Sequence, residues 1–180
     1  IDKYDERGNE IEEAYIGVDG KPCLVDGCAK RTHKYDDCGN LVEYANFGVD
    51  GKPCLRQDIA RYTSQYDERG NNIETAYFGV DGKPCLNYQG IAKSMSKHDE
   101  RGKTIEETYY GIDNEPCLSK DGYAKLTYKY DGRGNVLEEA YFGVDGRPCL
   151  NKNGYAIYAK KYDKRGNLIE KAYFGVDGNP

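Results

Sequence analysis

Apolar and polar residues alternate along short stretches of the chain, most clearly between residues 123 and 130. One face of this stretch carries Ala124, Leu126, Tyr128 and Tyr130, and the other carries Lys125, Thr127 and Lys129. Such alternation predicts a β-strand. Residues 131–135 follow as a turn in which Gly134 and Asn135 can adopt positive φ, and residues 136–142 form a returning strand. The pattern therefore predicts a β-hairpin with a loop of about four or five residues.

The polar face of this hairpin also predicts its charge pairing. Lys125 and Lys129 lie on the first strand, and Glu138 and Glu139 lie on the returning strand. If the register places them on one face, each cross-strand ion pair stabilises the hairpin by about 0.2–1 kcal/mol. A helix is excluded, because glycine recurs every few residues and no window sustains a 3.6-residue period.

The same hairpin pattern recurs along the whole chain. A Tyr-Asp-x-Arg-Gly-Asn motif or a near variant starts at Tyr4, Tyr35, Tyr66, His98, Tyr130 and Tyr162, so the period is 31 or 32 residues. Each copy continues with an Ile/Val-Glu segment, an aromatic pair or a near variant, and a Gly-Val-Asp-Gly-Lys-Pro-Cys-Leu segment or a near variant. We therefore predict one continuous repeat array over residues 1–180, whose last unit is incomplete.

The predicted fold class is an all-β, elongated tandem array of β-hairpins. The hairpins either continue one twisted sheet or form the coils of a β-solenoid-like rod, and the sheet is the preferred alternative. The one-residue difference in period lies between the repeated Cys and the next Ala, as in Cys54 to Ala60 against Cys85 to Ala92. Loops tolerate such a change and strand ladders do not, so this segment is predicted to be a surface loop.

The composition fits a thin structure. Hydrophobic residues make up 38% and charged residues 32% of the chain, which has 18 Tyr and no Trp. A tyrosine ring can pack while its hydroxyl stays hydrated. The net charge is −5, and acidic and basic residues are interleaved in every repeat, so no basic surface is predicted for a nucleic-acid partner. No apolar stretch is long enough for a membrane span. Because the chain opens and ends within the motif, we expect a segment of a longer repeat protein.

Five of the seven cysteines occupy one repeat position, directly after Pro: Cys23, Cys54, Cys85, Cys117 and Cys149. We predict semi-buried small apolar residues at this position. In an open sheet they would lie about 9.5 Å apart in successive repeats, beyond the Cα separation of about 7 Å that a disulfide spans. Disulfides between them would therefore indicate a solenoid.

The other two cysteines have distinct expectations. A disulfide between Cys23 and Cys28 is feasible across the intervening turn, because the two are five residues apart. Cys38 lies at the opposite end of a strand from Cys28, too far away to pair with it. Cys38 would then be unpaired in a turn and free for an intermolecular bond.

No motif predicts catalysis, a metal site or a cofactor. His33 and His98 stand alone without a Cys-x-x-Cys, the Asp-Gly pairs lack clustered calcium ligands, and the paired acids recur in every repeat. We expect a protein that is not an enzyme. A row of repeated tyrosines is the one candidate binding surface, with glycan as its candidate ligand: Tyr15, Tyr77, Tyr109, Tyr141 and Tyr173.

The turn motif resembles the YD repeat of bacterial RHS proteins, most closely over residues 161–168 and 177–178. That resemblance implies β-hairpins, which in RHS proteins spiral into a shell that often encloses a toxin. Two differences are that YD repeats have a shorter period and lack the Pro-Cys-Leu and Gly-Tyr-Ala-Lys segments. The copy at residues 98–103 also loses the Tyr and the Asn.

Two weaker resemblances concern other repeats. The hairpin unit is similar to MORN-type repeats, which are shorter and rely on Gly and Trp. Residues 141–146 are similar to cell-wall-binding repeats, which bind choline or glycans in Trp-rich cages that this chain lacks.

Three functions are consistent with these features. The first is a structural or interaction scaffold in a larger bacterial surface or secreted protein, which associates end to end or with flanking repeats and forms filaments. The second is a glycan or cell-wall binding module. The third is an RHS-like shell or spacer for a domain outside this chain.

Overall fold

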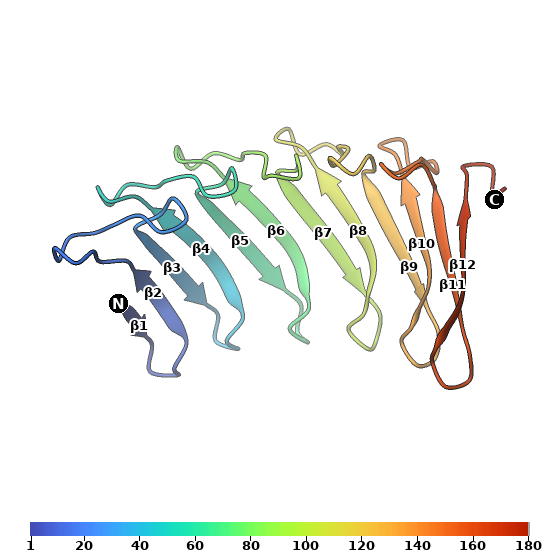
Figure 1. The fold of residues 1–180 in the computed structure, drawn as a ribbon, viewed down its shortest axis with the longest axis horizontal. Helices are drawn as coiled ribbons and strands as arrows, with labels where there is room; N and C mark the ends of the chain where they lie inside the picture. The colour runs from blue at the N-terminus through green and yellow to red at the C-terminus, as the bar shows by residue number, and fades with distance from the viewer. Residues whose placement is uncertain (180) are drawn as a thin grey trace. The chain divides into compact units, whose positions relative to one another are not determined.

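The computed structural model describes residues 1–179, which form strands joined by turns and loops (Figure 1). The chain divides into two compact units, Ile1–Tyr88 and Gln89–Pro180. The strands of the first unit are β1 (Asp2–Tyr4), β2 (Glu10–Ala14), β3 (Lys30–Tyr35), β4 (Leu41–Phe47), β5 (Arg61–Tyr66) and β6 (Asn72–Phe78). Those of the second are β7 (Lys93–His98), β8 (Thr104–Tyr110), β9 (Lys125–Tyr130), β10 (Val136–Phe142), β11 (Ile157–Tyr162) and β12 (Leu168–Phe174).

Within each unit the strands are antiparallel and lie side by side in chain order. The prediction of an all-β tandem hairpin array is therefore confirmed, and the described residues contain no helix. In each unit the hairpins continue an open sheet, as the preferred alternative requires, and do not wind into solenoid coils.

Pairing is longer within a hairpin than between hairpins. In the β3–β4 hairpin the pairs run from Lys30↔Phe47 to Tyr35↔Leu41, with a bulge at the turn end. Between β4 and β5 only three pairs form, from Glu43↔Thr63 to Ala45↔Arg61. Neighbouring hairpins therefore separate toward their turns, where other contacts must connect them.

The turn motif closes the hairpin with one Asp and one Asn in every copy except the fourth, which has Lys103 in place of the Asn. Asp131 Oδ1 accepts hydrogen bonds from the main-chain N–H groups of Arg133 and Asn135 at 2.8 and 2.9 Å, and its Oδ2 accepts from Asn135 Nδ2 at 2.8 Å. Gly134 has φ 87°, as predicted, whereas Asn135 is not among the residues with positive φ. The Asn is present for its side-chain amide, which binds the Asp, and not for its φ.

The connection that follows each hairpin, such as residues 143–150, turns the chain back along the returning strand. Pro148 pairs with Phe142 as an isolated bridge, and the N–H of Cys149 donates to the carbonyl of Tyr141 at 3.0 Å. The loop that follows holds the one-residue difference, as predicted. Its short form closes between Arg56 and Ile59, whereas the long form closes with a hydrogen bond from Asn151 N to Tyr155 O, at 3.0 Å.

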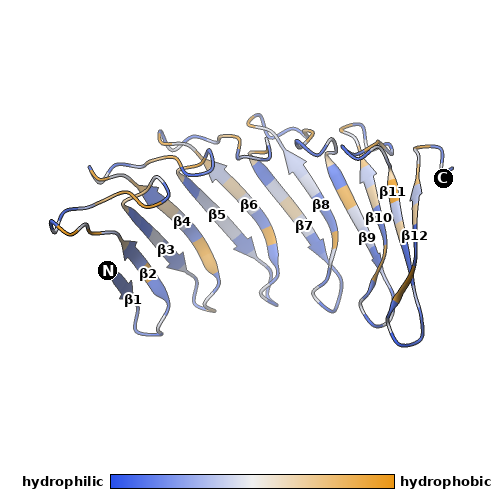
Figure 2. Ribbon diagram, in the orientation of Figure 1, coloured by the Kyte–Doolittle hydropathy of each residue, from blue (hydrophilic) through white to orange (hydrophobic). Residues whose placement is uncertain are grey.

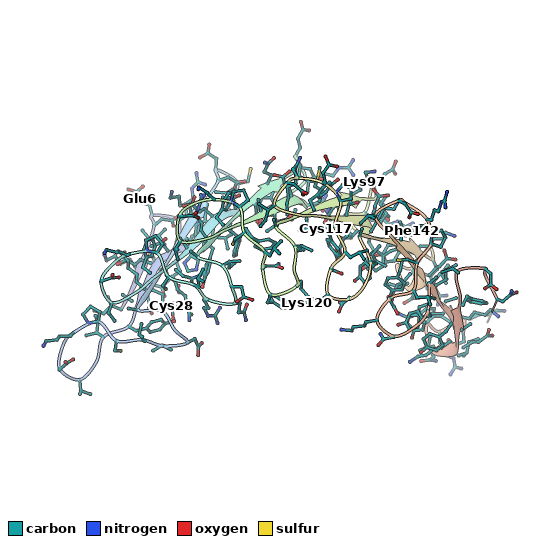
Figure 3. All side chains as sticks on the ribbon, turned by 90° about the horizontal axis from the view of Figure 1, so that it is seen from above. Glu6, Cys28, Lys97, Cys117, Lys120 and Phe142 are labelled. Atoms are coloured by element: carbon teal, nitrogen blue, oxygen red, sulfur yellow. The ribbon has the colours of Figure 1, made fainter. Side chains whose placement is uncertain are left out.

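The sheet has two chemically different faces. One, here called the ionic face, carries the predicted Lys129–Glu138 ion pair at 2.8 Å. Lys125 lies on the same face but is opposite Phe142 in its own hairpin, and its ammonium approaches Glu106 of the preceding hairpin at 3.9 Å. In the second unit the loops project from the opposite side, with Lys120 on one of them (Figure 3).

The core is thin and lies under these loops. Its most regular part is a row of almost fully buried alanines at one repeat position: Ala29, Ala60, Ala92, Ala124 and Ala156. The larger buried cluster of the second unit consists of Tyr123, Leu126 and Tyr141. Figure 2 accordingly shows hydrophobic residues as short separate segments along the strands.

Candidate functional site

The predicted tyrosine row lies on the face opposite the ionic face, here called the tyrosine face. Its members in the second unit occupy the second-to-last position of the returning strands: Tyr109, Tyr141 and Tyr173. Their rings are separated by loop tyrosines. Tyr123 and Tyr155, each directly before a buried alanine, insert between them.

The result is a continuous stack of five rings, here called the tyrosine stack. Ring centroids lie 5.7 Å apart for Tyr109–Tyr123, 4.9 Å for Tyr123–Tyr141, 5.8 Å for Tyr141–Tyr155 and 4.9 Å for Tyr155–Tyr173. These are tilted or edge-on contacts, which ring quadrupoles favour. The loop tyrosines were not predicted as site residues, although the Gly-Tyr-Ala-Lys segment marks them.

Acidic residues hold two hydroxyls of the stack. Tyr109 donates to Glu107 at 3.0 Å, and Tyr141 donates to Glu139 at 3.0 Å. Burial, and then the neighbouring carboxylate, raises the pKa of Tyr109 and of Tyr141 far above the ordinary value. Lys160 binds Glu139 from the next hairpin at 2.9 Å. The hydroxyls therefore stay protonated at neutral pH and act as structural donors.

Solvent reaches the stack mainly at one end. Tyr123 is 9% exposed and Tyr141 6%, whereas Tyr173 is 47% exposed. Tyr158 stacks on Tyr173 almost in parallel, with centroids 4.9 Å apart and an interplanar angle of 6°. Tyr173, with Tyr158 parallel behind it, therefore offers the most open aromatic surface of the stack.

In the first unit the tyrosine row is interrupted. Arg31 lies over the ring of Tyr15 at 5.1 Å and binds Glu13 at 3.0 Å. Asn46 occupies the row position in the second repeat and is 1% exposed. Within the described residues its side-chain amide has no hydrogen-bond partner. The row is thus not a uniform series of tyrosines in space.

The histidine of this unit takes part in an aromatic contact. His33 packs against Tyr44 at 5.3 Å, and Tyr44 stacks on Tyr62 at 5.2 Å. His33 Nδ1 also lies 3.7 Å from Glu10. These contacts place His33 in the packing between hairpins.

A groove between consecutive turns is a second candidate surface, which sequence reasoning missed. In the first unit it measures about 640 Å³ and is lined by Asp5, Glu6, Arg7, Ile11, His33, Lys34, Tyr35, Asp36 and Asp37. In the second unit a groove of about 440 Å³ is lined largely by residues at equivalent repeat positions, including Arg101, Ile105 and Tyr130. The separation of the hairpins toward their turns opens both.

Two kinds of contact bridge these grooves. Arg101 donates to the carbonyl of Gly132 in the next turn at 2.8 Å, and Arg7 donates likewise to Asp37. The hydroxyl of Tyr130 donates back to the carbonyl of Thr104 at 2.7 Å. The Tyr and Arg of the turn motif thus connect one hairpin to its neighbours.

The repeated cysteines lie against the loop of the preceding repeat. Cys85 Sγ lies 3.7 Å from the carbonyl of Asp58, and Cys149 Sγ lies 3.6 Å from that of Gly122. All seven cysteines are free thiols in the structure. The repeated position is partly buried, which agrees with the expectation of semi-buried small residues.

Cys23, Cys28 and Cys38 were singled out from the sequence. Cys38 is exposed in the β3–β4 turn, as predicted. Cys28 is fully buried, and its Sγ lies 3.5 Å from Sγ of Cys54 in the next repeat. The structure therefore places the thiol of Cys54 next to Cys28. The disulfide between Cys23 and Cys28 stays a prediction.

Acidic residues of the strands form ion pairs, and those of the turns accept turn hydrogen bonds. Glu12, for example, contacts Lys3 at 2.7 Å and Lys30 at 3.6 Å. Across residues 1–179, no three His, Cys, Asp or Glu side chains converge as a metal site would require. The same residues include no helix of the length and apolarity needed to cross a membrane.

Comparison with known proteins adds no relative. No protein-family model matches the chain, and a search of curated proteins finds no match either. The resemblance to YD repeats therefore stays a prediction that rests on the turn motif.

Proposed function

We propose that the chain is a non-enzymatic scaffold whose role is to stack hairpins of one kind into a repeat array. The observation that carries this proposal is the recurrence of one set of hairpin-to-hairpin contacts. Tyr35 donates to Glu10 O at 3.0 Å in the first unit, as Tyr130 donates to Thr104 O in the second. Repeat arrays are stabilised by such nearest-neighbour contacts.

The use of the charged side chains supports the same proposal. Glu43 binds Lys34 at 2.7 Å and Arg61 at 2.9 Å, so one carboxylate connects three successive strands. Burial raises the pKa of Glu43, but the two cations outweigh it and the pKa is lowered overall. An acid held ionised between two cations is suited to holding strands together and not to proton transfer.

The partner that fits such an array is another hairpin of the same kind, from flanking repeats or from a second copy of the chain. Between hairpins, Tyr141 N donates to Ala156 O at 2.9 Å, and Glu139 pairs with Tyr158. Lys171 on β12 is equivalent to Glu139, so its N–H lies on the edge that faces away from β11. Strand addition at this edge would extend the array end to end into a filament.

Sedimentation velocity over a range of concentrations tests this proposal. We expect the chain to form larger species as its concentration rises. Lys171→Pro removes the outward N–H and should abolish them, whereas the matched Lys171→Ala should retain them. A chain that stays monomeric at high concentration, with the outward amides of β12 protected from hydrogen exchange, would contradict self-association.

A glycan-binding function is a second candidate, favoured by the open Tyr158–Tyr173 pair. The exposed ring of Tyr173, with Tyr158 parallel behind it, offers a flat apolar surface to a sugar ring. Tyr173→Ala should then abolish retention on cell-wall glycan, whereas Tyr88→Ala, at another exposed tyrosine, should not. Unchanged retention of Tyr173→Ala would exclude this surface. The resemblance to RHS and cell-wall-binding repeats supports a secreted or cell-surface location for either function.

A further inference from the structure

Two different repeat positions meet where a loop packs on the following repeat. The Cys that follows Pro in one repeat lies beside a loop residue of the preceding repeat. This loop residue is the one directly before the buried alanine. Cys149 thus packs against the cluster that contains Tyr123. Tyr123, Tyr155, Ile59 and Ile91 fill this loop position elsewhere, but Cys28 fills it in the first repeat. Within residues 1–179, the contact between Cys28 and Cys54 is therefore the only one of this kind in which both partners are cysteines.

The main chain holds both thiols at this contact. Cys28 closes a tight turn, with hydrogen bonds to and from Val25 at 3.2 and 2.8 Å. The N–H of Cys54 donates to the carbonyl of Asn46 at 3.0 Å, on the neighbouring strand. The two Sγ atoms lie 3.5 Å apart, and Cys54 Sγ is also 3.7 Å from the carbonyl of Gly27. A disulfide bond, with sulfur atoms about 2 Å apart, requires the two thiols to move closer than this contact.

We propose that Cys28 and Cys54 form an intrachain disulfide that links the loop of the first repeat covalently to the second repeat. The oxidant is a small aliphatic disulfide. The Cys54 thiolate attacks one of its sulfurs and releases one thiolate, which leaves a mixed disulfide on Cys54. The Cys28 thiolate then attacks Cys54 Sγ and releases the second thiolate. The protein loses two electrons and two protons, and the small disulfide becomes two thiols.

Exposure sets the order of these steps. Cys28 is fully buried and Cys54 is partly exposed, so the external disulfide reaches Cys54 first (Cys28 is labelled in Figure 3). Burial, and then the neighbouring Cys28 thiol, raises the pKa of Cys54 to about 11. Because the thiolate is the nucleophile, the reaction should accelerate as the pH rises from neutral.

Peptide mapping of the folded chain after treatment with oxidised glutathione tests the proposal. Trypsin alone leaves Cys23 with Cys28 and Cys38 with Cys54, because Lys–Pro bonds resist it. Added Asp-N protease separates all four. The expected product is fragment 26–30 linked to fragment 50–56, with a mass two hydrogens below their sum. The exposed Cys38 should carry glutathione in the same sample, which shows that the oxidant acted.

Three results would overturn the proposal: a link between fragments 19–25 and 26–30, glutathione on Cys54 beside a free Cys28, or unreacted Cys28 and Cys54 where Cys38 is modified. Closing this loop should also raise the midpoint of thermal unfolding by about 5–10 °C. The matched control is Cys85→Ser, whose loop neighbour is Ile59. It should keep the link and the shift, whereas Cys54→Ser should lose both.

Discussion

The hydroxyl of Tyr66 donates a hydrogen bond at 3.0 Å to the main-chain carbonyl of Leu41, which lies 25 residues earlier. Leu41 opens the returning strand of the preceding hairpin, at the end where neighbouring hairpins are no longer paired. The bond therefore ties together two hairpins that the strand ladder has released. Tyr35 makes the equivalent bond in the same unit, which explains the Tyr of the repeated motif.

Tyr66→Phe tests the contribution of this bond. The substitution keeps the ring and leaves the carbonyl of Leu41 without its donor, so the free energy of unfolding should fall by about 0.5–1.5 kcal/mol. Urea denaturation of the native chain and the variant measures it. Tyr4→Phe is the matched control, because Tyr4 is exposed on β1 at the same motif position. Equal losses for the two variants would contradict the role assigned to the hydroxyl.

The tyrosine stack predicts a size requirement at the loop position. Tyr123→Ala removes a buried ring from between Tyr109 and Tyr141 and should lower the free energy of unfolding by about 3–5 kcal/mol. Tyr123→Ile should cost clearly less, because Ile91 fills the equivalent position and is buried there. Thermal denaturation ranks the variants. Similar losses for Ala and Ile would show that the stack does not support the loop.

The turn motif predicts acid sensitivity. Hydrogen bonds from the Asn40 side chain and main chain lower the pKa of Asp36 below 3.8 in the folded state. A depressed pKa contributes stability that is fully present above the unfolded value and is lost as the pH falls toward the folded one. The midpoint temperature of thermal unfolding should therefore decrease when the pH is lowered below about 4.

Asn40→Ala removes the largest cause of this shift. The pKa of Asp36, measured by NMR titration, should rise toward 3.8, and the stability that this group loses as the pH falls below about 4 should become smaller. In the fourth copy Lys103 replaces the Asn, and its main-chain N–H donates to Asp99 at 2.9 Å. Lys103→Ala retains that donor and is the control. A pKa of Asp36 that Asn40→Ala leaves unchanged would refute this account of the motif.

Buried tyrosines predict a second limit at high pH. The pKa of Tyr141 is raised above 10.0 in the folded state by burial and by Glu139. A raised pKa contributes stability that is fully present below the unfolded value and is lost as the pH rises above about 10. Phenolate absorbance should therefore increase together with the loss of β-sheet circular dichroism. Tyr141→Phe should make this loss less steep, and an unaltered profile would contradict the assignment.

The sequence predicts the parts of the fold that are set by local chemistry. Alternation along residues 123–130 predicts the strand, and Lys129 and Glu138 predict the ion pair that forms across the hairpin. Gly134 predicts a turn because few other residues tolerate φ 87°. Each of these features depends on residues that are close in the sequence.

Contacts between repeats are harder to predict, because they join different repeat positions. Equivalent cysteines are too far apart in an open sheet, yet Cys28 meets Cys54 through an offset of 26 residues. A contact between different repeat positions likewise places Tyr123 between Tyr109 and Tyr141. A comparison of each position only with its own equivalents does not find such contacts. The register between hairpins is needed to reveal them.

Deletion of one complete repeat tests the central claim most directly, because a stacked array depends on nearest neighbours and not on one shared core. Removal of residues 99–130 joins His98 to Asp131, which keeps the motif in phase. Urea denaturation followed by circular dichroism should show a folded β-protein with an unchanged spectral shape per residue and a modestly lower free energy of unfolding. A shortened chain that is unfolded in the absence of urea would contradict the account.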